Sequence, residues 1–458
     1  MSKSTKKPPS ERPSKPAAKA NAHADEALDH NDEEELKTLP PVLPSSASEK
    51  IVEDPYEELN KLEESTTPVT FEREMELIKQ LPVHKGLVNV VVDYTTICAM
   101  DGFTGELFYR GYSIADLVQK SNFEEVAFLL LFGKLPSTFE IESFRQQLIK
   151  ERDIPDRILM ILQSFPRQTT RIELLRTAIS ALSLYDEDDY NYTEMANIRK
   201  GIRIIAKIPT ILAYSHRIKA NLPLVEPSKD LPHAGNFYYM MTGIRPMPEI
   251  TDAFDKILIC QAEHDLNAST FAARVTVSTL SDIYSAVVSA IGALRGPLHG
   301  GANERVINYL MYEIKWKKNV IPWLEEKLAK KEKIMGFGHR VYKREDPRAV
   351  ILRKLSHEFW IKEEGKHFEH DNVYEMGEIL ANYMIEKKHI YPNVDFYSAS
   401  LLHALKVPHP LYTPLFAASR AAGWVAHCIE QLKDNKIIRP RLRYTGEIGK
   451  QYVDINQR

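Results

Sequence analysis

Three side chains of this sequence lie in short segments that suit proton transfer, and His299 is the first of them. It lies in the glycine-rich segment 296–304, just before the expected start of a helix near Asn303. The positive end of the helix dipole disfavours an imidazolium at this place, which favours a neutral histidine that can donate a hydrogen bond. Because a single histidine in a turn is more often a packing or capping residue, the alternative for His299 is structural.

His339 lies in a second glycine-lined segment, 336–343, with Arg340, Lys343 and Arg348 close by. Such a basic loop suits anions, although its GxG spacing is too short for a nucleotide-binding fingerprint. The alternative is an ordinary surface loop, because a run of charged residues is usually exposed to solvent without a further role.

Asp395 lies among apolar neighbours in the segment 392–398, before an expected helix at 398–405. Burial would raise the pKa of its carboxyl group and the helix dipole would lower it, so the sequence leaves the direction open. As a base, Asp395 would have to reach a C–H proton directly, so its position matters as much as its pKa. The structural alternative is an aspartate that caps the helix.

Four further residues could bind an anionic ligand. His264 lies where one expected helix ends and another begins at Ser269. Arg348, Arg420 and Arg439 could each bind a carboxylate, because a planar guanidinium donates two parallel hydrogen bonds and keeps its charge. Taken singly, each arginine is more often surface charge or an ion-pair partner.

The elements that must position these residues are mostly helices. Apolar residues recur at three- and four-residue steps over the segments 123–132, 172–184, 250–262, 281–294 and 306–314. Before them, a β-rich stretch from Val88 to Tyr112, with a turn at Asp101 and Gly102, predicts a small hairpin near the N-terminal end of the fold. Strands and helices do not alternate regularly, so we expect a mainly α fold without a Rossmann domain.

Composition narrows the class of protein. A chain of 458 residues exceeds the usual single core, so its length predicts two domains, or one large domain with tails. With 60 Lys and Arg against 63 Asp and Glu, the formal net charge of −3 provides no general attraction for nucleic acid or an anionic membrane. The sequence has no apolar run near the roughly 18 residues that span a bilayer.

The cysteines and the N-terminal segment bear on the compartment. Cys98, Cys260 and Cys428 are far apart and have no metal-ligand spacing, which favours a reducing compartment. Residues 1–66 are rich in Lys, Pro, Ser, Ala and Glu, so we expect a disordered charged tail with no assigned function. Its acidic stretch argues against a transit peptide, and a cytoplasmic location is the expectation.

Three motifs together resemble the citrate synthase family. They are GPLHGGANE at 296–304, GFGHRVYK at 336–343 followed by Asp346-Pro347-Arg348, and PNVDFYS at 392–398. The likeness runs from about residue 85 to 444 and is nearest to the shorter bacterial type, a group that includes 2-methylcitrate synthases. The resemblance implies a two-domain, all-helical fold, with a large domain of residues 67–297 and 409–458 and a small domain of residues 298–408.

The resemblance implies a Si-type citrate synthase of the tricarboxylic acid cycle, an acyltransferase. Asp395 would remove a proton from the methyl group of acetyl-CoA, while His299 would hydrogen-bond the acetyl oxygen as it becomes an enolate. His339 would polarise and protonate the carbonyl group of oxaloacetate. Hydrolysis of the citryl thioester would then release citrate and CoA.

The resemblance also implies the binding residues. Oxaloacetate would be bound by His264, Arg348 and Arg420, and by Arg439 from the partner subunit of a homodimer. CoA would be bound by Lys343 at its phosphates and by Ile334, Gly336 and Gly338 at its adenine portion. Acetyl-CoA is a substrate in this reaction, and the resemblance implies no metal or other cofactor.

Three alternatives stay open. A 2-methylcitrate synthase would use propionyl-CoA with the same catalytic groups, and one methylene is worth only about 1 to 3 kcal/mol in a pocket. Arg340 and Lys343 look more like the simple bacterial citrate synthases, which favours acetyl-CoA. A non-catalytic scaffold relative is the second alternative, against which the intact His299, His339 and Asp395 argue. Cleavage of citryl-CoA in the reverse direction would share the site.

Overall fold

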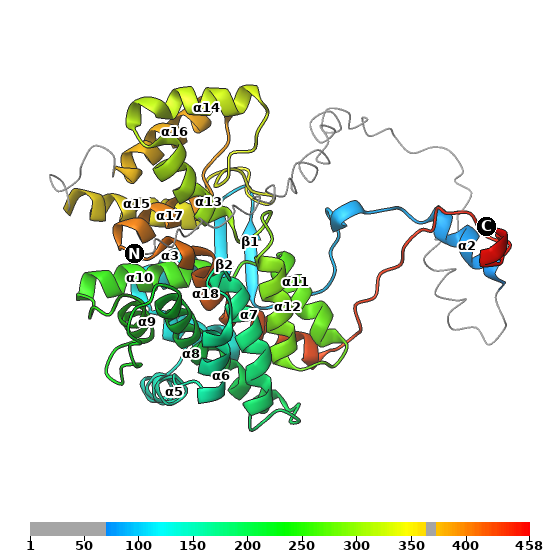
Figure 1. Cartoon of the computed structure of the whole chain (residues 1–458), viewed down its shortest axis with the longest axis horizontal. Helices are drawn as coiled ribbons and strands as arrows, with labels where there is room; N and C mark the ends of the chain where they lie inside the picture. Colours follow the sequence, from blue (N-terminus) through cyan, green and yellow to red (C-terminus); the bar gives the residue numbers. More distant parts are fainter. Residues whose placement is uncertain (1–69, 363–371) are drawn as a thin grey trace, which may run out of the picture. The chain divides into compact units, whose positions relative to one another are not determined.

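The structure of the protein is a computed structural model that describes residues 70–362 and 372–458 (Figure 1). The expected tail at residues 1–66 lies outside the described residues. The chain divides into two units, one of residues 1–89 with 442–458 and one of residues 90–441.

The described part of the first unit contains one α-helix and two short 3₁₀ turns. Helix α2 (Phe71–Gln80) begins after Thr70, whose hydroxyl oxygen accepts a hydrogen bond from the backbone N–H of Arg73. The 3₁₀ turns are η3 (Lys85–Leu87) and η8 (Ile455–Gln457). Arg443 donates a hydrogen bond to the carbonyl oxygen of Leu81, which connects the C-terminal segment to the end of α2.

The second unit begins with a small antiparallel sheet in the order β1-β2-β3, with strands Cys98–Asp101, Glu106–Tyr109 and Tyr112–Ser113. The carboxylate of Asp101 accepts backbone hydrogen bonds from Phe103 at 2.7 Å and Thr104 at 3.1 Å, which fixes the turn between β1 and β2. The predicted hairpin is therefore confirmed, with a short third strand added. The expectation of β structure at residues 90–92 is wrong, because Val91 is 89% exposed and these residues have no pairing strand.

The remaining regular structure of the second unit is helical, as predicted. Its α-helices are α3 (Ile114–Lys120), α4 (Phe123–Phe132), α5 (Thr138–Lys150), α6 (Asp156–Ser164), α7 (Arg171–Leu182), α8 (Glu194–Lys219), α9 (His233–Thr242), α10 (Pro248–Gln261), α11 (Ala268–Ser278), α12 (Ile283–Leu294), α13 (Ala302–Asn308), α14 (Val320–Ala329), α15 (Pro347–Lys362), α16 (Val373–Lys388), α17 (Val394–Ala404) and α18 (Tyr412–Lys433). Short helical turns are η4 (Ser183–Tyr185), η5 (Tyr309–Ile314), η6 (Lys317–Asn319) and η7 (His409–Leu411).

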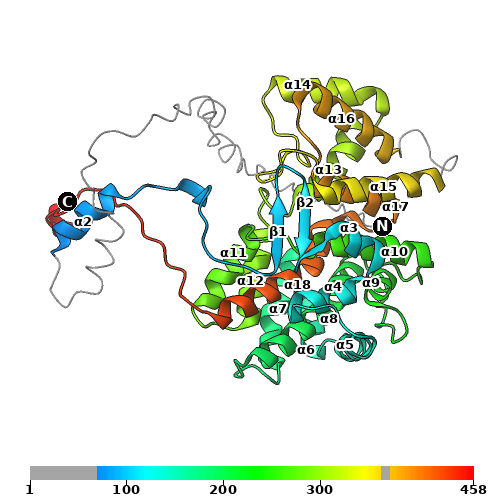
Figure 2. The ribbon, with the colours of Figure 1, turned by 180° about the vertical axis from the view of Figure 1, so that it is seen from behind.

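Helix α18 is the centre of the second unit. It packs against α4, α7, α8, α10, α11 and α12, and Figures 1 and 2 show it among them from both sides. Gly201 of α8 has no side chain where a Cβ atom would overlap Val425 of α18, so this glycine lets the two longest helices approach closely. A buried helix that touches so many others is well placed to hold polar groups in fixed positions.

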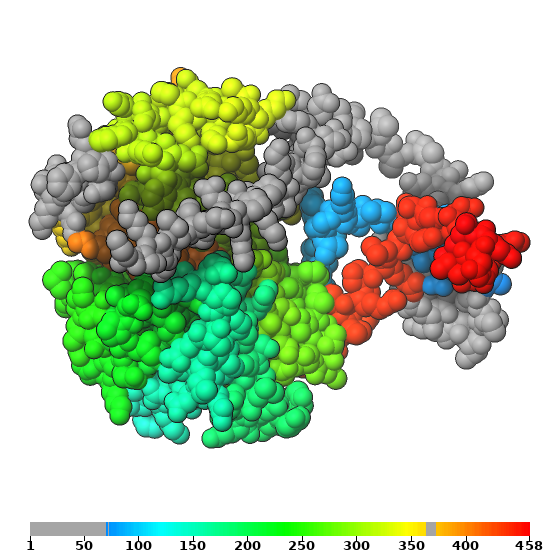
Figure 3. All heavy atoms as spheres, in the orientation of Figure 1, coloured from blue at the N-terminus to red at the C-terminus, as the bar shows by residue number. Residues whose placement is uncertain are grey.

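Helices α13 to α17 contact one another extensively, with α15 on α17, α13 on α17, and α14 on α16. In the space-filling view, the yellow-green residues of α14 lie at the opposite end of this unit from the teal residues of α5 and α6 (Figure 3). The division into a large and a small domain stays a prediction. Among the described helices, none combines the length and apolar character needed to cross a membrane.

Candidate active site

Hydrogen bonds join the segment of His339 to the segment of Asp395. Asn393 donates from its backbone to the carbonyl oxygen of Gly336 at 2.9 Å and from its side chain to the carbonyl oxygen of Gly338 at 3.1 Å. These bonds hold the glycine-lined loop beside the start of α17. The segments that carry His339 and Asp395 are therefore fixed relative to each other.

Asp395 lies in the first turn of α17, which begins at Val394 and not at residue 398 as expected. The N-cap residue is Asn393, whose side-chain oxygen accepts the backbone N–H of Asp395 at 3.1 Å. The structural alternative, in which Asp395 caps the helix, is therefore wrong. Its carboxyl group is free for another purpose.

The carboxyl group of Asp395 is set apart from other polar groups of the described chain. Its Oδ1 atom is buried and has no hydrogen-bond partner there. Burial raises the pKa of Asp395 to about 7, with the charge of Asp346 adding to the rise and Arg348 and Arg420 opposing it. Desolvation thus outweighs the two arginine charges, and a carboxylate with a pKa near neutrality is suited to act as a general base.

His339 is held as a neutral ring with a defined tautomer. Its Nδ1 atom accepts hydrogen bonds from the backbone N–H groups of Val341 at 3.0 Å and Tyr342 at 3.3 Å. A nitrogen that accepts two such bonds carries no proton, so the single proton of the neutral ring is on Nε2. Burial lowers the pKa of His339 to about 4, the charge of Arg348 lowers it further, and Asp346 opposes the shift.

His299 is held through a neighbouring hydroxyl group. Its Nε2 atom lies 2.8 Å from Oγ of Ser269, which also accepts the indole N–H of Trp424 at 3.1 Å. The Ser269 hydroxyl also lies at hydrogen-bond distance, 2.7 Å, from the side-chain oxygen of Asn267, which already accepts two backbone N–H groups. If Ser269 donates to His299, the ring proton lies on Nδ1 and is available to a ligand.

The electrostatic surroundings favour the neutral form of His299. Burial lowers its pKa to about 4, and the positive charge of Arg420 contributes. The neutral state expected for His299 is therefore favoured in the folded site, and its main cause is burial.

His264 lies beside Tyr342 and His339. Its Nε2 atom is 3.3 Å from the hydroxyl oxygen of Tyr342, and its ring centre is 5.0 Å from that of His339. Burial holds the pKa of His264 well below its usual value, with the charges of Arg348, His339 and Arg420 acting in the same direction.

Arg348 forms a buried, two-pronged ion pair with Asp346. The guanidinium donates to the two carboxylate oxygens at 2.9 and 2.7 Å, and Asp346 also accepts the backbone N–H of Val394 at 3.2 Å. Although burial raises the pKa of Asp346, the Arg348 charge holds it below its usual value. The pair uses Nε and Nη2 of Arg348, leaves Nη1 for a ligand, and connects this arginine to the start of α17.

Arg420 projects from α18 and is buried without an ion-pair partner in the described chain. Its Nε donates to the carbonyl oxygen of Gln261 at 2.7 Å, and its guanidinium carbon lies 4.8 Å from the ring centre of Phe416. The terminal nitrogens make no hydrogen bond to a described residue. They can therefore donate two parallel hydrogen bonds to a carboxylate.

A cavity of about 210 Å³ lies beside His339. Its lining consists of Gly338, His339, Tyr342, Lys343, Arg344, Asp346, His389, Ile390, Tyr391 and Pro392. Two of the predicted CoA-binding residues, Lys343 and Gly338, are part of this lining, whereas Ile334 and Gly336 are outside it. Arg439 is exposed after α18 and makes no hydrogen bond or ion pair with the other candidates in the described single chain.

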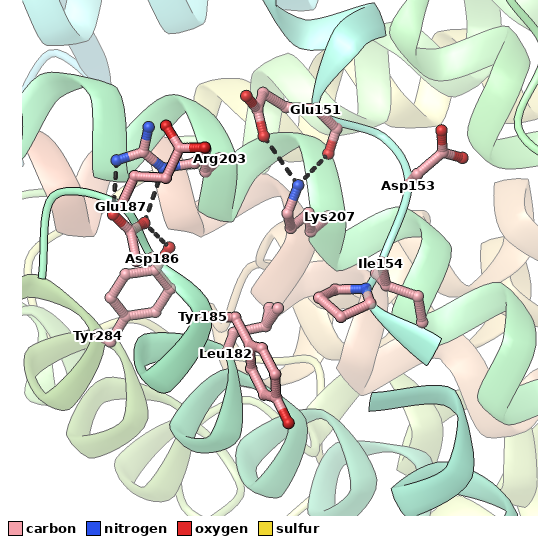
Figure 4. A pocket seen from close by; sticks show the side chains of 11 residues that line it. Glu151, Asp153, Ile154, Leu182, Tyr185, Asp186, Glu187, Arg203, Lys207 and Tyr284 are labelled. Carbon is pink, nitrogen blue, oxygen red and sulfur yellow. Dashed lines mark hydrogen bonds and ion pairs between the residues drawn. The ribbon is translucent and has the colours of Figure 1, made fainter. Parts of the chain in front are cut away.

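A larger cavity of about 310 Å³ lies elsewhere, and no predicted site residue lines it (Figure 4). Its two cations are already paired, Arg203 with Asp186 at 2.6 Å and Lys207 with Glu151 at 2.9 Å. Of the two cavities, only the smaller is lined by predicted site residues, and His299 and Asp395 line neither of them.

Sequence reasoning gave no role to several residues that hold the candidates in place. They are Ser269, Tyr342, Asp346, Asn393 and Trp424. The available signal was closeness in sequence for some of them, since Tyr342 follows His339 by three residues and Asp346 precedes Arg348 by two. Trp424 gave no such signal, because only the fold brings it to Ser269.

A helical fold with neutral buried histidines, an unpaired carboxyl group of raised pKa and two buried arginines is typical of an enzyme that moves protons on a carboxylate substrate. Comparison with known proteins gives the family. The model of the citrate synthase C-terminal domain matches residues 86–441. The chain therefore belongs to the citrate synthase family, which consists of enzymes that transfer an acyl group.

Individual relatives cover most of the chain. Citrate synthase 2 of Bacillus subtilis is 45% identical over 376 residues, covering 82% of this chain and 99% of its own length. A 2-methylcitrate synthase of Mycobacterium tuberculosis is 41% identical over 364 residues, covering 80% and 91%. The structure of a Thermoplasma acidophilum citrate synthase with carboxymethyl coenzyme A and oxaloacetate has a TM-score of 0.78 at 34% identity, covering 82% and 100%. Membership of a family of enzymes argues against the alternative of a non-catalytic scaffold relative.

Proposed function

We propose that the protein condenses acetyl-CoA with oxaloacetate and water to give citrate and CoA. The observation that carries this proposal is the buried, unpaired carboxylate oxygen of Asp395, whose pKa is raised to about 7 and whose segment is hydrogen-bonded to the loop of His339. The citrate synthase relatives support it, as do the two ligands of the Thermoplasma acidophilum complex.

In the first step, the carboxylate of Asp395 removes a proton from the methyl group of acetyl-CoA. The electron pair of the broken C–H bond moves toward the acetyl oxygen, which becomes negative. His299 donates a hydrogen bond from Nδ1 to this oxygen, with Ser269 holding the opposite ring nitrogen. A donor that is already in place stabilises the developing charge without reorganisation.

In the second step, the enolate carbon attacks the ketone carbon of oxaloacetate and forms the new C–C bond. His339 carries its proton on Nε2, so it can polarise the ketone oxygen and protonate it as the bond forms. Water then hydrolyses the citryl thioester, which releases CoA as a thiol and leaves citrate.

Substrate binding follows from the free donors. The unoccupied N–H groups of Arg348 and Arg420 bind the carboxylates of oxaloacetate, and His264 adds a hydrogen bond. Arg439 completes the site across a homodimer, which agrees with its exposed position in the single chain.

Lys343 binds a CoA phosphate, and closure of residues 298–408 over the large domain excludes water. The reaction requires no cofactor beyond its substrates, and we place it in the cytoplasm.

The proposal is tested by thiol release from acetyl-CoA in the presence of oxaloacetate. The Asp395→Ala variant should lose roughly 10²- to 10⁴-fold in kcat, because a general base contributes about that much. It should still be stabilised thermally by oxaloacetate, whose binding groups are intact. Unchanged turnover in this variant would refute the assigned base.

The second candidate is 2-methylcitrate synthase activity, which the Mycobacterium tuberculosis relative favours. The ratio of kcat/KM for acetyl-CoA to that for propionyl-CoA decides between the two. We expect a ratio of about 10 or more in favour of acetyl-CoA, within the range that one methylene provides. A ratio below one would make 2-methylcitrate synthesis the main activity.

A further inference from the structure

One stripe of α18 faces the segment that connects α10 to α11. Arg420, Gly423 and His427 follow one another at three- and four-residue steps, which places them on the same side of the helix. Arg420 donates to the carbonyl oxygen of Gln261 at 2.7 Å. At Gly423 a Cβ atom would overlap the carboxylate of Glu263, so the helix and this glutamate are in close contact.

Glu263 is fully buried and is held by His427. Its Oε1 atom lies 3.0 Å from Nε2 of His427, whose Nδ1 lies 3.4 Å from Nη1 of Arg274. A guanidinium can only donate, so Nδ1 of His427 carries no proton and Nε2 donates to Glu263. Arg274 is itself paired with Asp93 at 2.6 Å and with Glu430 at 3.2 Å, so its charge is already balanced.

Glu263 and Arg420 are therefore two buried charges that lack a direct partner of opposite sign. The Oε2 atom of Glu263 has no hydrogen-bond partner in the described chain, and Arg420 has no carboxylate bound to it there. Both groups lie on the same face of α18, where Glu263 meets the helix about one turn beyond Arg420. An isolated buried charge is costly, whereas an opposite charge nearby offsets part of that cost.

We propose that Glu263 is a positioning residue that supplies the counter-charge for Arg420 without occupying its terminal hydrogen-bond donors. This inference rests on the proposed function, in which Arg420 binds a carboxylate of oxaloacetate. His427 keeps the Glu263 carboxylate turned to its own N–H group. The terminal nitrogens of Arg420 therefore stay free for the substrate while its charge is compensated in the empty site.

The effect of burial on Arg420 agrees with this arrangement. Burial lowers the pKa of Arg420, and the negative charge of Glu263 is the largest influence in the opposite direction. The same negative charge also repels the dianionic substrate. Removing it while keeping the side-chain shape should leave Arg420 uncompensated in the free protein and let oxaloacetate bind more tightly.

The test is a calorimetric titration of the full chain with oxaloacetate, without CoA. For Glu263→Gln we expect the dissociation constant to fall about threefold to tenfold, because a negative charge that acts on Arg420 also acts on the carboxylate that Arg420 binds. The matched control is Glu430→Gln, which removes a carboxylate from the same region that is bound to Arg274 and Thr96 and not directed at Arg420. This control should leave the dissociation constant unchanged.

A gain in affinity separates a charge effect from structural damage, which would weaken binding. Unchanged or weaker binding by Glu263→Gln would overturn the inference, provided that the unmodified chain binds oxaloacetate. If the unmodified chain does not bind it, the proposed function fails and this inference fails with it.

A second variant keeps the inference falsifiable if Glu263→Gln does not fold. Glu263→Ala removes the same carboxylate and places a smaller side chain beside Gly423. The loss of the negative charge should again tighten oxaloacetate binding. Weaker or unchanged binding by a folded Glu263→Ala variant would count against the counter-charge role.

Discussion

At the scale of single residues, the decisive feature is how burial acts on each titratable group. The same loss of water raises the pKa of Asp395 to about 7 and lowers the pKa of His299 and His339 to about 4. Burial disfavours the charged form in every case, which is an anion for the carboxyl group and a cation for the imidazoles. The site thus contains a weakly acidic carboxyl group among neutral hydrogen-bond donors.

This difference predicts the pH dependence of activity. Asp395 acts only when it is deprotonated, so kcat/KM for acetyl-CoA should fall below a pH of about 7 and approach a tenfold loss per pH unit. His299 and His339 stay neutral between pH 5 and 8 and should add no second limb there. Initial rates of thiol release across this range measure the profile. An acid limb near pH 4 would mean that burial does not control the base.

At the scale of elements, Asn393 joins helix formation to site geometry. Its side-chain oxygen caps α17 and its side-chain N–H group donates to the carbonyl oxygen of Gly338. One residue thus sets where α17 begins, and with it the position of Asp395 relative to the loop of His339.

The two functions of Asn393 can be separated by substitution. Asn393→Ala removes both and should lower the free energy of unfolding by about 1 to 2 kcal/mol, the usual cost of a lost cap. Asn393→Asp keeps a capping oxygen and loses the donor, so it should retain most of the stability and still lose activity. Urea denaturation and kcat measure the two effects. If Asn393→Asp is fully active, the contact with Gly338 does not position the site.

Helix positions were predicted well and helix ends less well, for a physical reason. Apolar spacing identified α4 at its observed limits of Phe123–Phe132, because its buried face is continuous and Asn122 and Gly133 end it. The helix expected at 306–314 instead ends as α-helix at Asn308 and continues as a π-helical turn, Tyr309–Ile314. Such a change in hydrogen bonding depends on the packing around the turn, which sequence spacing does not specify.

At the scale of the whole molecule, the buried histidines connect stability to pH. Burial lowers the pKa of His216 to about 4 and that of His233 to about 3, and the three site histidines are lowered as well. A group whose pKa is lower in the folded state binds fewer protons there than in the unfolded state. The stability that it contributes is present above its unfolded pKa of about 6.5 and is lost as the pH falls toward 4.

The free energy of unfolding should therefore be lower at pH 5 than at pH 7, by several kcal/mol in order of magnitude. Asp395 acts in the opposite direction, because its raised pKa makes the folded state bind more protons between about pH 4 and 7. Burial also raises the pKa of Asp255 and Asp265, and it lowers the pKa of a sixth histidine, His409. Three carboxyl groups are thus outnumbered by six histidines among the described residues. Guanidinium denaturation at the two pH values measures the difference, and equal or greater stability at pH 5 would contradict the neutral buried histidines.

The sequence by itself determined the mainly helical fold, the small hairpin and the three motifs that carry His299, His339 and Asp395. Helical periodicity and local motifs are properties of neighbouring residues, so a sequence contains them directly. The tertiary structure decided the direction of the pKa of Asp395, the proton position on His339, the pairing of Arg348 with Asp346, and the contact of α18 with Glu263. These depend on burial and on groups that can be far apart along the chain, such as Glu263 and His427 with a separation of 164 residues. Only the folded chain brings such groups together and removes the water around them.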